Sequence, residues 1–358
     1  MATINWRKRL AAGAIALAAG FALPATAQGT PAPTQTPQQD AAREQLQRQQ
    51  DQPFNNAPVW RDVRSGGPQT TQVRGVETNV LVQSEGETWR QIRNGPITVY
   101  GGLLMLAVPL LILGFFLWKG PMKVHGALTG RKILRLTPWD RYIHWTTAIS
   151  WCVLAISGLI LLFGKYVLMP IIGGTLFSWL AQLAKILHNF IGPVFLLAAI
   201  LMFVQYVGRN IPRGHDFGWL AKGGGLLTGQ HVPSGFFNAG EKIVFWVGLT
   251  FFTLVVGASG LVLLFPNFDQ GREIMQISNI VHATAGVLYM AMMMGHIYLG
   301  SVGVEGAWEA MRYDGMVDEA WAKEHHEYWY NEVKSGRQGS AAPMAGVAAS
   351  RREPGETT

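Results

Sequence analysis

Four histidines lie inside long apolar stretches of this 358-residue chain. Ionisable side chains are rare in such stretches, and where they occur they are usually functional. A neutral imidazole can bind a metal, carry a proton or simply donate a hydrogen bond to a neighbouring helix. One such histidine could have only the last role, so the argument depends on how the four are arranged. They are His144, His188, His282 and His296.

The spacing of these histidines sorts them into two pairs. His282 and His296 share one apolar stretch and are fourteen residues apart. In a helix this separates them by about 21 Å and returns them to within about 40° of the same face. His188 begins a stretch that would enter the membrane from the side of His282, and His144 begins one that would enter from the side of His296. We therefore expect the pairs His188–His282 and His144–His296.

Two imidazoles facing each other across a helix bundle are what a low-spin haem iron requires. Cys152 is the only cysteine, so the chain lacks the C-x-x-C-H attachment of a c-type haem. Any haem would be held without a covalent bond, as a b-type haem is. A porphyrin also needs room, and a small residue follows each histidine by one helical turn: Ala148, Gly192, Gly286 and Gly300.

Two other uses of intramembrane histidines fit the sequence less well. Zinc takes three or four ligands at one depth, whereas each depth offers two histidines with no carboxylate or thiol beside them. A proton relay would be favoured by Asp or Glu within the apolar stretches, and these stretches contain none. Two b-type haems stacked across a membrane remain the favoured interpretation.

The elements that must position these histidines are membrane-spanning helices. The chain is 49% hydrophobic and 14% charged, against about 25% charged in soluble domains. A helix spans a bilayer with roughly 20 apolar residues. Five stretches reach this length, which predicts an all-α integral membrane bundle: a four-helix di-haem core plus one extra N-terminal helix. They are approximately 97–118, 142–164, 186–207, 243–265 and 277–300.

The distribution of positive charge predicts how the bundle is oriented. Positively charged loops stay in the cytoplasm, and the loops after the first and third stretches are the basic ones. The loops after the second and fourth carry only Lys165, Lys185 and Arg272. The C-terminal tail would therefore be cytoplasmic and the pair His188–His282 would be the outer one. The basic loops contain Lys119, Lys123, Arg131, Lys132, Arg135 and Arg141, then Arg209, Arg213, Lys222 and Lys242.

The N-terminus resembles a secretory signal. Arg7, Lys8 and Arg9 precede an apolar run, and Ala25-Thr26-Ala27 closes it as an A-x-A cleavage site. The alternative is an uncleaved first span. Cleavage would leave a mature periplasmic N-terminus in a multi-pass protein of the bacterial inner membrane. The predicted organisation is a signal peptide (1–27), a flexible exported segment (28–96), an extra transmembrane helix (97–118), a basic cytoplasmic loop (119–141), the di-haem core (142–300) and a cytoplasmic tail (301–358).

A short pattern, W-R-x-x-R-x-G, occurs twice on the exported side, at 60–66 and 89–95. The two copies could dock a partner subunit, or they could be amphipathic turns beside the membrane. Outside the apolar stretches, His125, His215 and His231 are expected to be solvated. His325 and His326 fall in an aromatic stretch, 321–330, expected to be one amphipathic helix that covers the end of the bundle.

With these features the chain resembles the gamma subunit, or cytochrome b subunit, of membrane-bound formate dehydrogenases. The resemblance covers about 137–334 and depends on several motifs in order. They are P-W-D-R-Y-I-H-W (138–145), I-L-H-N-F-I-G (186–192), Y-V-G-R-N-I-P (206–212), F-N-A-G-E-K (237–242), I-V-H-A-T-A-G (280–286), H-I-Y (296–298) and W-A-K-E-H-H (321–326).

The resemblance implies an electron-transfer subunit without the formate-oxidising site. Its partners would be a catalytic subunit holding molybdenum or tungsten, and an iron–sulfur subunit. Electrons would pass through the outer haem b (His188, His282) and the inner haem b (His144, His296) to menaquinone or ubiquinone. The quinone would lie at Asn238, Gly240 and Lys242, although Asn238 could equally cap the fourth span.

The chain departs from the shorter family pattern in its signal peptide, exported segment and extra first span, which leaves the docking arrangement open. Two rival functions also fit part of the pattern. One is the cytochrome b subunit of a nickel–iron hydrogenase or a related oxidoreductase, which copurifying subunits would reveal. The other is a transporter or a membrane anchor without haem, which would be colourless when purified.

Overall fold

The computed structural model describes Gln47, Gln50, Asp51, residues 57–65, and residues 84–336 except Asp269 and Tyr313. The predicted signal peptide lies outside the described residues, as does much of the exported segment. Two compact units are formed. Among the described residues, the first contains 142–206 and 244–299 with those up to Gly120, and the second contains 121–141, 207–243 and those from Gly300 to Gly336.

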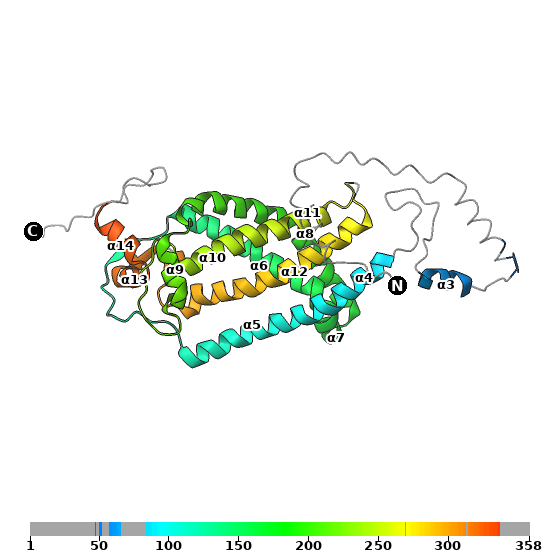
Figure 1. Ribbon diagram of the computed structural model, residues 1–358, viewed down its shortest axis with the longest axis horizontal. Helices are drawn as coiled ribbons and strands as arrows, with labels where there is room; N and C mark the ends of the chain where they lie inside the picture. Colours follow the sequence, from blue (N-terminus) through cyan, green and yellow to red (C-terminus); the bar gives the residue numbers. More distant parts are fainter. Residues whose placement is uncertain are drawn as a thin grey trace, which may run out of the picture. The chain divides into compact units, whose positions relative to one another are not determined.

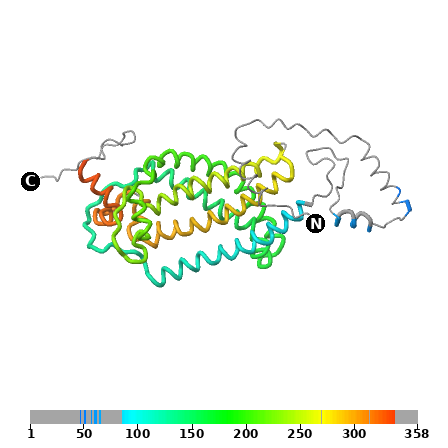
Figure 2. The backbone as a smooth tube through the Cα atoms, in the orientation of Figure 1, coloured from blue at the N-terminus to red at the C-terminus, as the bar shows by residue number. Residues whose placement is uncertain are grey.

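Long helices make up most of the first unit, and the first residues of two of them belong to the second unit. Within the described residues, five helices are long and apolar enough to cross a membrane, which confirms the predicted helical membrane bundle. Figures 1 and 2 show them running side by side, with α12 packed against α11 and α5. Three of the five are single helices: α6 (Pro138–Val167), α8 (Gly174–Tyr206) and α12 (Arg272–Tyr298). The first of the five consists of α4 (Ser84–Ile92), which continues through a wide turn (Arg93–Ile97) into α5 (Thr98–Lys119). The fourth consists of α10 (Ala239–Ile243), which continues through wide turns (Val244–Phe252) into α11 (Thr253–Leu264).

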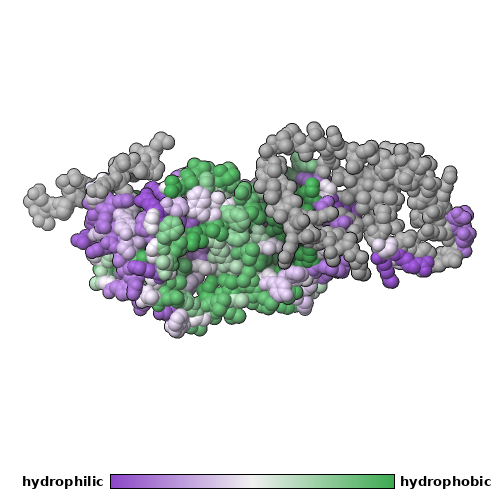
Figure 3. Space-filling view, viewed as in Figure 1, coloured by the Kyte–Doolittle hydropathy of each residue, from purple (hydrophilic) through white to green (hydrophobic). Residues whose placement is uncertain are grey.

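Apolar side chains on the outer faces of these helices fit a lipid environment. Leu106 and Leu111 of α5 are 66% and 71% exposed, and Leu254 of α11 is 67% exposed. A water-soluble protein rarely exposes so continuous an apolar surface, which Figure 3 shows over the long helices. Pro109 and Pro193 lie inside α5 and α8, as membrane helices tolerate.

The helices extend beyond the predicted apolar stretches. One large difference is at α8, which begins at Gly174 and not near Ile186. The prediction stopped at Lys185 because it required a stretch free of charge. The structure starts the helix after Gly173, whose positive φ of 79° ends the short helix α7 (Met169–Ile172). Glycine adopts a positive φ of this kind without the steric cost that a β-carbon would bring.

The second unit combines a small sheet with short helices. Strand β1 (Lys132–Leu134) pairs antiparallel with β2 (Met316–Asp318), so that Ile133 lies opposite Val317. Its helices are α9 (Gly214–Ala221), α13 (Glu319–His325) and α14 (Glu327–Lys334), and its tight turns are Val207–Arg209, Gly223–Gly225 and Glu309–Met311. The buried core contains Leu136, Ala310, Val317, Trp321, Ala322 and Trp329.

The aromatic stretch 321–330 is not one helix, which corrects the expectation. The helix breaks at His326, where φ is −141° and ψ is 53°. The break places this imidazole in the core, where it is 2% exposed and its Nδ1 lies 2.8 Å from the carbonyl oxygen of Gly235. Burial is the main cause that lowers the pKa of His326 well below its usual value, and the nearby Arg135 guanidinium adds to it.

Candidate haem sites

The structure brings the four intramembrane histidines together in the expected two pairs. His188 of α8 faces His282 of α12, with ring centres 6.0 Å apart and ring planes at 78°. His144 of α6 faces His296 of α12, with ring centres 6.4 Å apart and planes at 59°. One helix therefore supplies one histidine to each pair, and two different helices supply the partners.

These separations fit two axial ligands of one iron. With a metal–nitrogen bond of roughly 2.0 Å, the centre of an imidazole ring stands about 3 Å from the metal. Two imidazoles on opposite faces of an iron are therefore about 6 Å apart at their ring centres. Both pairs have this spacing, and neither ring pair is stacked. The ligand set fits a bis-imidazole haem iron.

Glycines leave open space beside the rings. A β-carbon added at Gly192, Gly286 or Gly300 would meet no described atom within 4 Å. All four histidines are also only half-buried, although they lie within the long helices. Packed helix interfaces seldom leave room of this kind. The space adjoins the ligands, where a porphyrin would lie.

The Nδ1 atom of each ring in the His188–His282 pair is fixed by a serine. Ser157 Oγ lies 2.8 Å from Nδ1 of His188, and Ser259 Oγ lies 3.2 Å from Nδ1 of His282. Each hydroxyl donates its hydrogen to a carbonyl one turn earlier, at Val153 (2.7 Å) and Val255 (2.6 Å). A hydroxyl has one hydrogen, so each serine accepts from Nδ1–H. The Nε2 lone pairs are then free to bind a metal.

The serines belong to a repeat that the sequence analysis missed. The heptapeptide S-G-L-x-L-L-F occurs at 157–163 and again at 259–265. In both copies a histidine ring lies beside the glycine after the serine, and at Gly260 the ring is so close that a β-carbon would crowd it. A β-carbon at Gly158 would lie 3.5 Å from Cε1 of His188, and one at Gly260 would lie 3.0 Å from Cε1 of His282. Comparing the two apolar stretches with each other would have found this signal.

The His144–His296 pair has a different surrounding. Nδ1 of His144 is buried and has no hydrogen-bond partner in the described part of the chain. The nearest aromatic group is Trp145, whose ring meets the His144 ring edge-on at 5.4 Å. The two sites therefore share their ligand type and spacing but differ in the hydrogen bonds to their ligands.

An aromatic layer lies between the two pairs. Tyr289 is seven residues after His282 and seven before His296 on α12, so the three share about one face of the helix. Its ring stacks on Phe252 at 5.5 Å and meets Trp151 edge-on at 5.6 Å. Tyr289 is 4% exposed, and its hydroxyl lies 3.1 Å from that of Thr253. The space between the sites is filled by packed side chains.

A zinc site in the described residues would require a cluster of three or four ligand side chains. Among the residues that the structure describes, no group of three or more His, Cys, Asp or Glu side chains is placed to bind a metal ion.

The half-buried residue Trp89, from the second W-R-x-x-R-x-G copy, donates to Asn279 of α12 (3.2 Å). Trp60, from the first copy, lies in α3 (Ala57–Ser65) and is 61% exposed. Partner docking by these copies stays a prediction.

The three predicted quinone residues lie together at the start of α10, in the second unit. Asn238 caps this helix: its Oδ1 accepts from the backbone N–H of Glu241 (2.9 Å), and its own N–H donates to the Glu241 carboxylate (2.7 Å). Gly240 leaves room for the Trp219 ring, because a β-carbon there would lie 3.0 Å from it. Quinone binding at these residues stays a prediction.

Lys242 is not a free cation. Its side chain is 7% exposed, and its Nζ lies 2.7 Å from Oδ2 of Asp216, whose side chain is 8% exposed. Burial alone would raise the pKa of Asp216, but hydrogen bonds from Lys242 and from the backbone N–H of Arg213 outweigh it and lower that pKa. The Asp216 carboxylate is therefore ionised at neutral pH, and the Nζ of Lys242 is already engaged by it.

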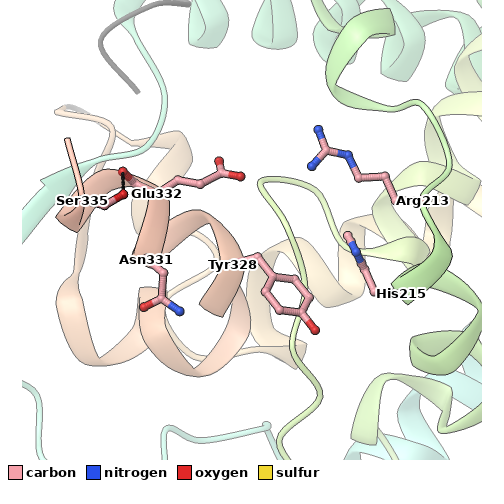
Figure 4. A pocket seen from close by; sticks show the side chains of 6 residues that line it. All are labelled: Arg213, His215, Tyr328, Asn331, Glu332 and Ser335. Atoms are coloured by element: carbon pink, nitrogen blue, oxygen red, sulfur yellow. Dashed lines mark hydrogen bonds between the residues drawn. The ribbon is translucent and has the colours of Figure 1, made fainter. Parts of the chain in front are cut away.

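A pocket of about 470 Å³ lies in the second unit, between α9 and α14. In Figure 4, the Arg213 and Glu332 side chains extend toward each other across it. His215 was expected to be solvated, but its side chain is only 23% exposed and its ring lies 4.9 Å from that of Tyr328. His125 and His231 are more exposed, at 66% and 38%, and contact Glu324 and Glu327. The pocket is lined by Arg213, His215, Tyr328, Asn331, Glu332 and Ser335.

Comparison with known proteins shows which family the chain belongs to. The sequence profile of the family described as prokaryotic cytochrome b561 matches residues 135–312. The cytochrome b556(fdo) subunit of formate dehydrogenase from Escherichia coli K12 is 35% identical over 205 residues, which is 56% of this chain and 93% of that protein. The chain belongs to the family of formate dehydrogenase cytochrome b556 subunits.

Further members of the family match the chain over a similar length. The nitrate-inducible formate dehydrogenase cytochrome b556(Fdn) subunit of Escherichia coli K12 is 32% identical over 210 residues, 57% of this chain and 93% of that protein. The cytochrome b556 subunit from Haemophilus influenzae is 27% identical over 207 residues, 56% of this chain and 83% of that protein. Formate dehydrogenase cytochrome b subunits transfer electrons within an enzyme complex, and a cytochrome b holds haem b.

Proposed function

We propose that this chain is the di-haem b membrane subunit of a quinone-linked formate dehydrogenase. The observation that carries the proposal is the pair of facing imidazoles at each end of α12, at ring separations of 6.0 and 6.4 Å. A haem b held between two imidazoles alternates between Fe(III) and Fe(II) and so carries one electron at a time. His188 and His282 would hold one haem, and His144 and His296 the other.

The proposed direction of electron flow follows from the orientation predicted by the basic loops. Electrons come from formate, oxidised at the molybdenum or tungsten centre of a catalytic subunit, by way of an iron–sulfur subunit. They enter at the His188–His282 pair on the periplasmic side and leave from the His144–His296 pair on the cytoplasmic side. Menaquinone or ubiquinone accepts them near Asn238 and Gly240. The described residues supply no catalytic group for formate.

In this proposal some side chains bind the haem iron and others hold those ligands in position. Ser157 and Ser259 hold the Nδ1 protons, which leaves Nε2 of His188 and His282 for the iron. Packed aromatic groups around Tyr289 exclude water between the two sites. At the quinone, the Asn238 amide and backbone N–H groups supply hydrogen-bond donors. Lys242 acts through its ion pair with Asp216, which holds α9 against α10.

The test is a haem count on the purified chain. A dithionite-reduced minus oxidised spectrum with a pyridine haemochrome assay is measured for the native chain, His188→Ala and His296→Ala. His231→Ala, at an exposed side chain outside the spans, is the control. We expect two haems b per chain, one in each ligand variant and two in the control. A well-folded native chain without haem would sink the proposal and favour a transporter or anchor.

A second measurement separates the proposed complex from its nearest relative in chemistry. The subunits that copurify with the native chain are identified, and the complex is assayed with formate and with hydrogen as electron donors. Formate-dependent quinone reduction by a molybdenum- or tungsten-containing complex is the expected result. A nickel–iron partner and hydrogen-dependent reduction would assign the chain to a hydrogenase instead.

A further inference from the structure

The two histidine pairs differ in what their Nδ1 atoms contact. Both Nδ1 atoms of the His188–His282 pair donate to serine hydroxyls, and Nδ1 of His282 also donates to the Val256 carbonyl at 2.9 Å. At the other pair, the buried Nδ1 of His144 has no partner in the described part of the chain. This difference bears on the electronic properties of any metal that the rings hold.

A hydrogen bond from Nδ1–H makes an imidazole a stronger electron donor. As the Nδ1 proton is drawn toward an acceptor, the ring gains imidazolate character and Nε2 becomes more basic. A more basic axial ligand stabilises Fe(III) relative to Fe(II), and the reduction potential of the haem falls. The effect requires an acceptor that is held in place, which both serines are because their own hydrogens are committed to backbone carbonyls.

We propose that Ser157 and Ser259 are positioning residues that lower the potential of the haem at the His188–His282 pair below that of the haem at the His144–His296 pair. The inference rests on the proposed function, because it requires a haem at each pair. The recurrence of the serine in both copies of S-G-L-x-L-L-F supports it, since each copy contacts a different ligand of the same site.

The consequence is a downhill electron transfer along α12. With a haem held at each pair, one electron would pass from the reduced iron between His188 and His282 to the oxidised iron between His144 and His296, so that one iron is oxidised as the other is reduced. No proton or bond is exchanged in this step. The serines favour this direction because they stabilise the oxidised form at the donor site only.

The experiment is a potentiometric titration of the full chain, purified with its native partners. Ser157→Ala and Ser259→Ala are compared with Ser150→Ala. Ser150 is a matched control on α6, because it is 5% exposed and bonds only to the carbonyls of Thr146 and Thr147. The haem at the His188–His282 pair is identified as the redox transition that is absent from the titration of His188→Ala.

Loss of one hydrogen bond changes an equilibrium by about two- to tenfold, and a tenfold change is about 59 mV for one electron. We therefore expect each alanine variant to raise the potential of the His188–His282 haem by up to this amount. The other haem, and both haems in Ser150→Ala, should keep their potentials. The double variant should shift further than either single variant.

The haem content of the native chain distinguishes a failure of the proposed function from a failure of the inference about the two serines. A native chain without two haems contradicts the proposed function, whereas two haems with unshifted potentials in both serine variants contradict this inference alone. If an alanine variant loses its haem, Ser157→Cys and Ser259→Cys replace it, because a thiol is a weaker acceptor of similar size. Haem-containing cysteine variants with native potentials would equally overturn the inference, and raised potentials would support it.

Discussion

A substitution at Gly286 can test whether a cofactor fills the open space beside His282. A β-carbon at this position would meet no described protein atom within 4 Å, and alanine favours a helix over glycine by about 1 kcal/mol. The protein alone would therefore tolerate Gly286→Ala. A porphyrin in the open space one turn after His282 would not, because its edge would meet the added methyl group.

We therefore expect Gly286→Ala to lower the haem content of the chain without lowering its yield or its thermal stability before haem is added. Gly114→Ala on α5 is the matched control, since a β-carbon there also meets nothing and no histidine lies on that helix. Pyridine haemochrome assays on both variants measure the effect. Equal, full haem content in the two variants would place the porphyrin elsewhere.

The Asp216–Lys242 pair raises a separate question at the same scale: whether Lys242 binds quinone or only supports the fold. Removing one member of a buried ion pair costs about 3 kcal/mol, because the other charge is left unpaired, whereas replacing both can be nearly neutral. Lys242→Met and Asp216→Leu should each destabilise the chain, and the double variant should recover most of the loss.

Quinone kinetics of that double variant then answer the question. The Lys242 ammonium group is already bound to the Asp216 carboxylate at 2.7 Å. We therefore expect the KM of the double variant for quinone to stay within about twofold of the native value, which is less than the effect of one hydrogen bond. The measurement is quinone reduction by the intact complex, with Asn238→Ala for comparison. A KM raised tenfold in a stable double variant would show that Lys242 contacts the quinone.

At the scale of elements, α13 and α14 are separated by a histidine that folding buries in its neutral form. The pKa of His326 is lowered mainly by burial, with the Arg135 guanidinium adding to it, against the Gly235 carbonyl that raises it. A depressed folded pKa gives stability that is fully present above the unfolded pKa of about 6.5. As the pH falls below that value, the unfolded chain gains a proton that the folded chain does not, and stability is lost.

The expected result is a thermal unfolding midpoint of the full chain that falls between pH 7 and pH 5. His326→Gln, which can still donate to the Gly235 carbonyl, should flatten that dependence even if it lowers the midpoint overall. His125→Gln, at a 66% exposed side chain, serves as the control. The assignment fails if the His326 variant keeps the native pH dependence.

The elements also show what the sequence could and could not predict. The histidine pairs were predictable because depth along a helix is set by residue count, so fourteen residues between His282 and His296 determine two levels. The role of Ser157 and Ser259 was not, because a serine within a helix usually bonds only to its own backbone. The helix break at His326 depends on a contact with Gly235, some ninety residues away, which no local pattern contains.

At the scale of the whole molecule, two haems at different depths would make the reaction generate a membrane potential. The pairs are about 21 Å apart along α12, and an electron that moves between them crosses much of a hydrocarbon core of about 30 Å. In the proposed arrangement, formate oxidation on the periplasmic side would release protons there, and quinone reduction on the cytoplasmic side would take protons up. Each charge moved against 100 mV stores about 2.3 kcal/mol.

Proteoliposomes containing the complete complex test this arrangement. With formate outside and quinone in the bilayer, we expect a voltage-sensitive dye to report a potential, negative on the cytoplasmic side, that an uncoupler abolishes while quinone reduction continues. His296→Ala should remove both the turnover and the potential, because it interrupts the path at the inner pair. Quinone turnover by the native complex without any potential would mean that both reactions occur on the same side of the membrane, and the predicted orientation of the two pairs would then be wrong.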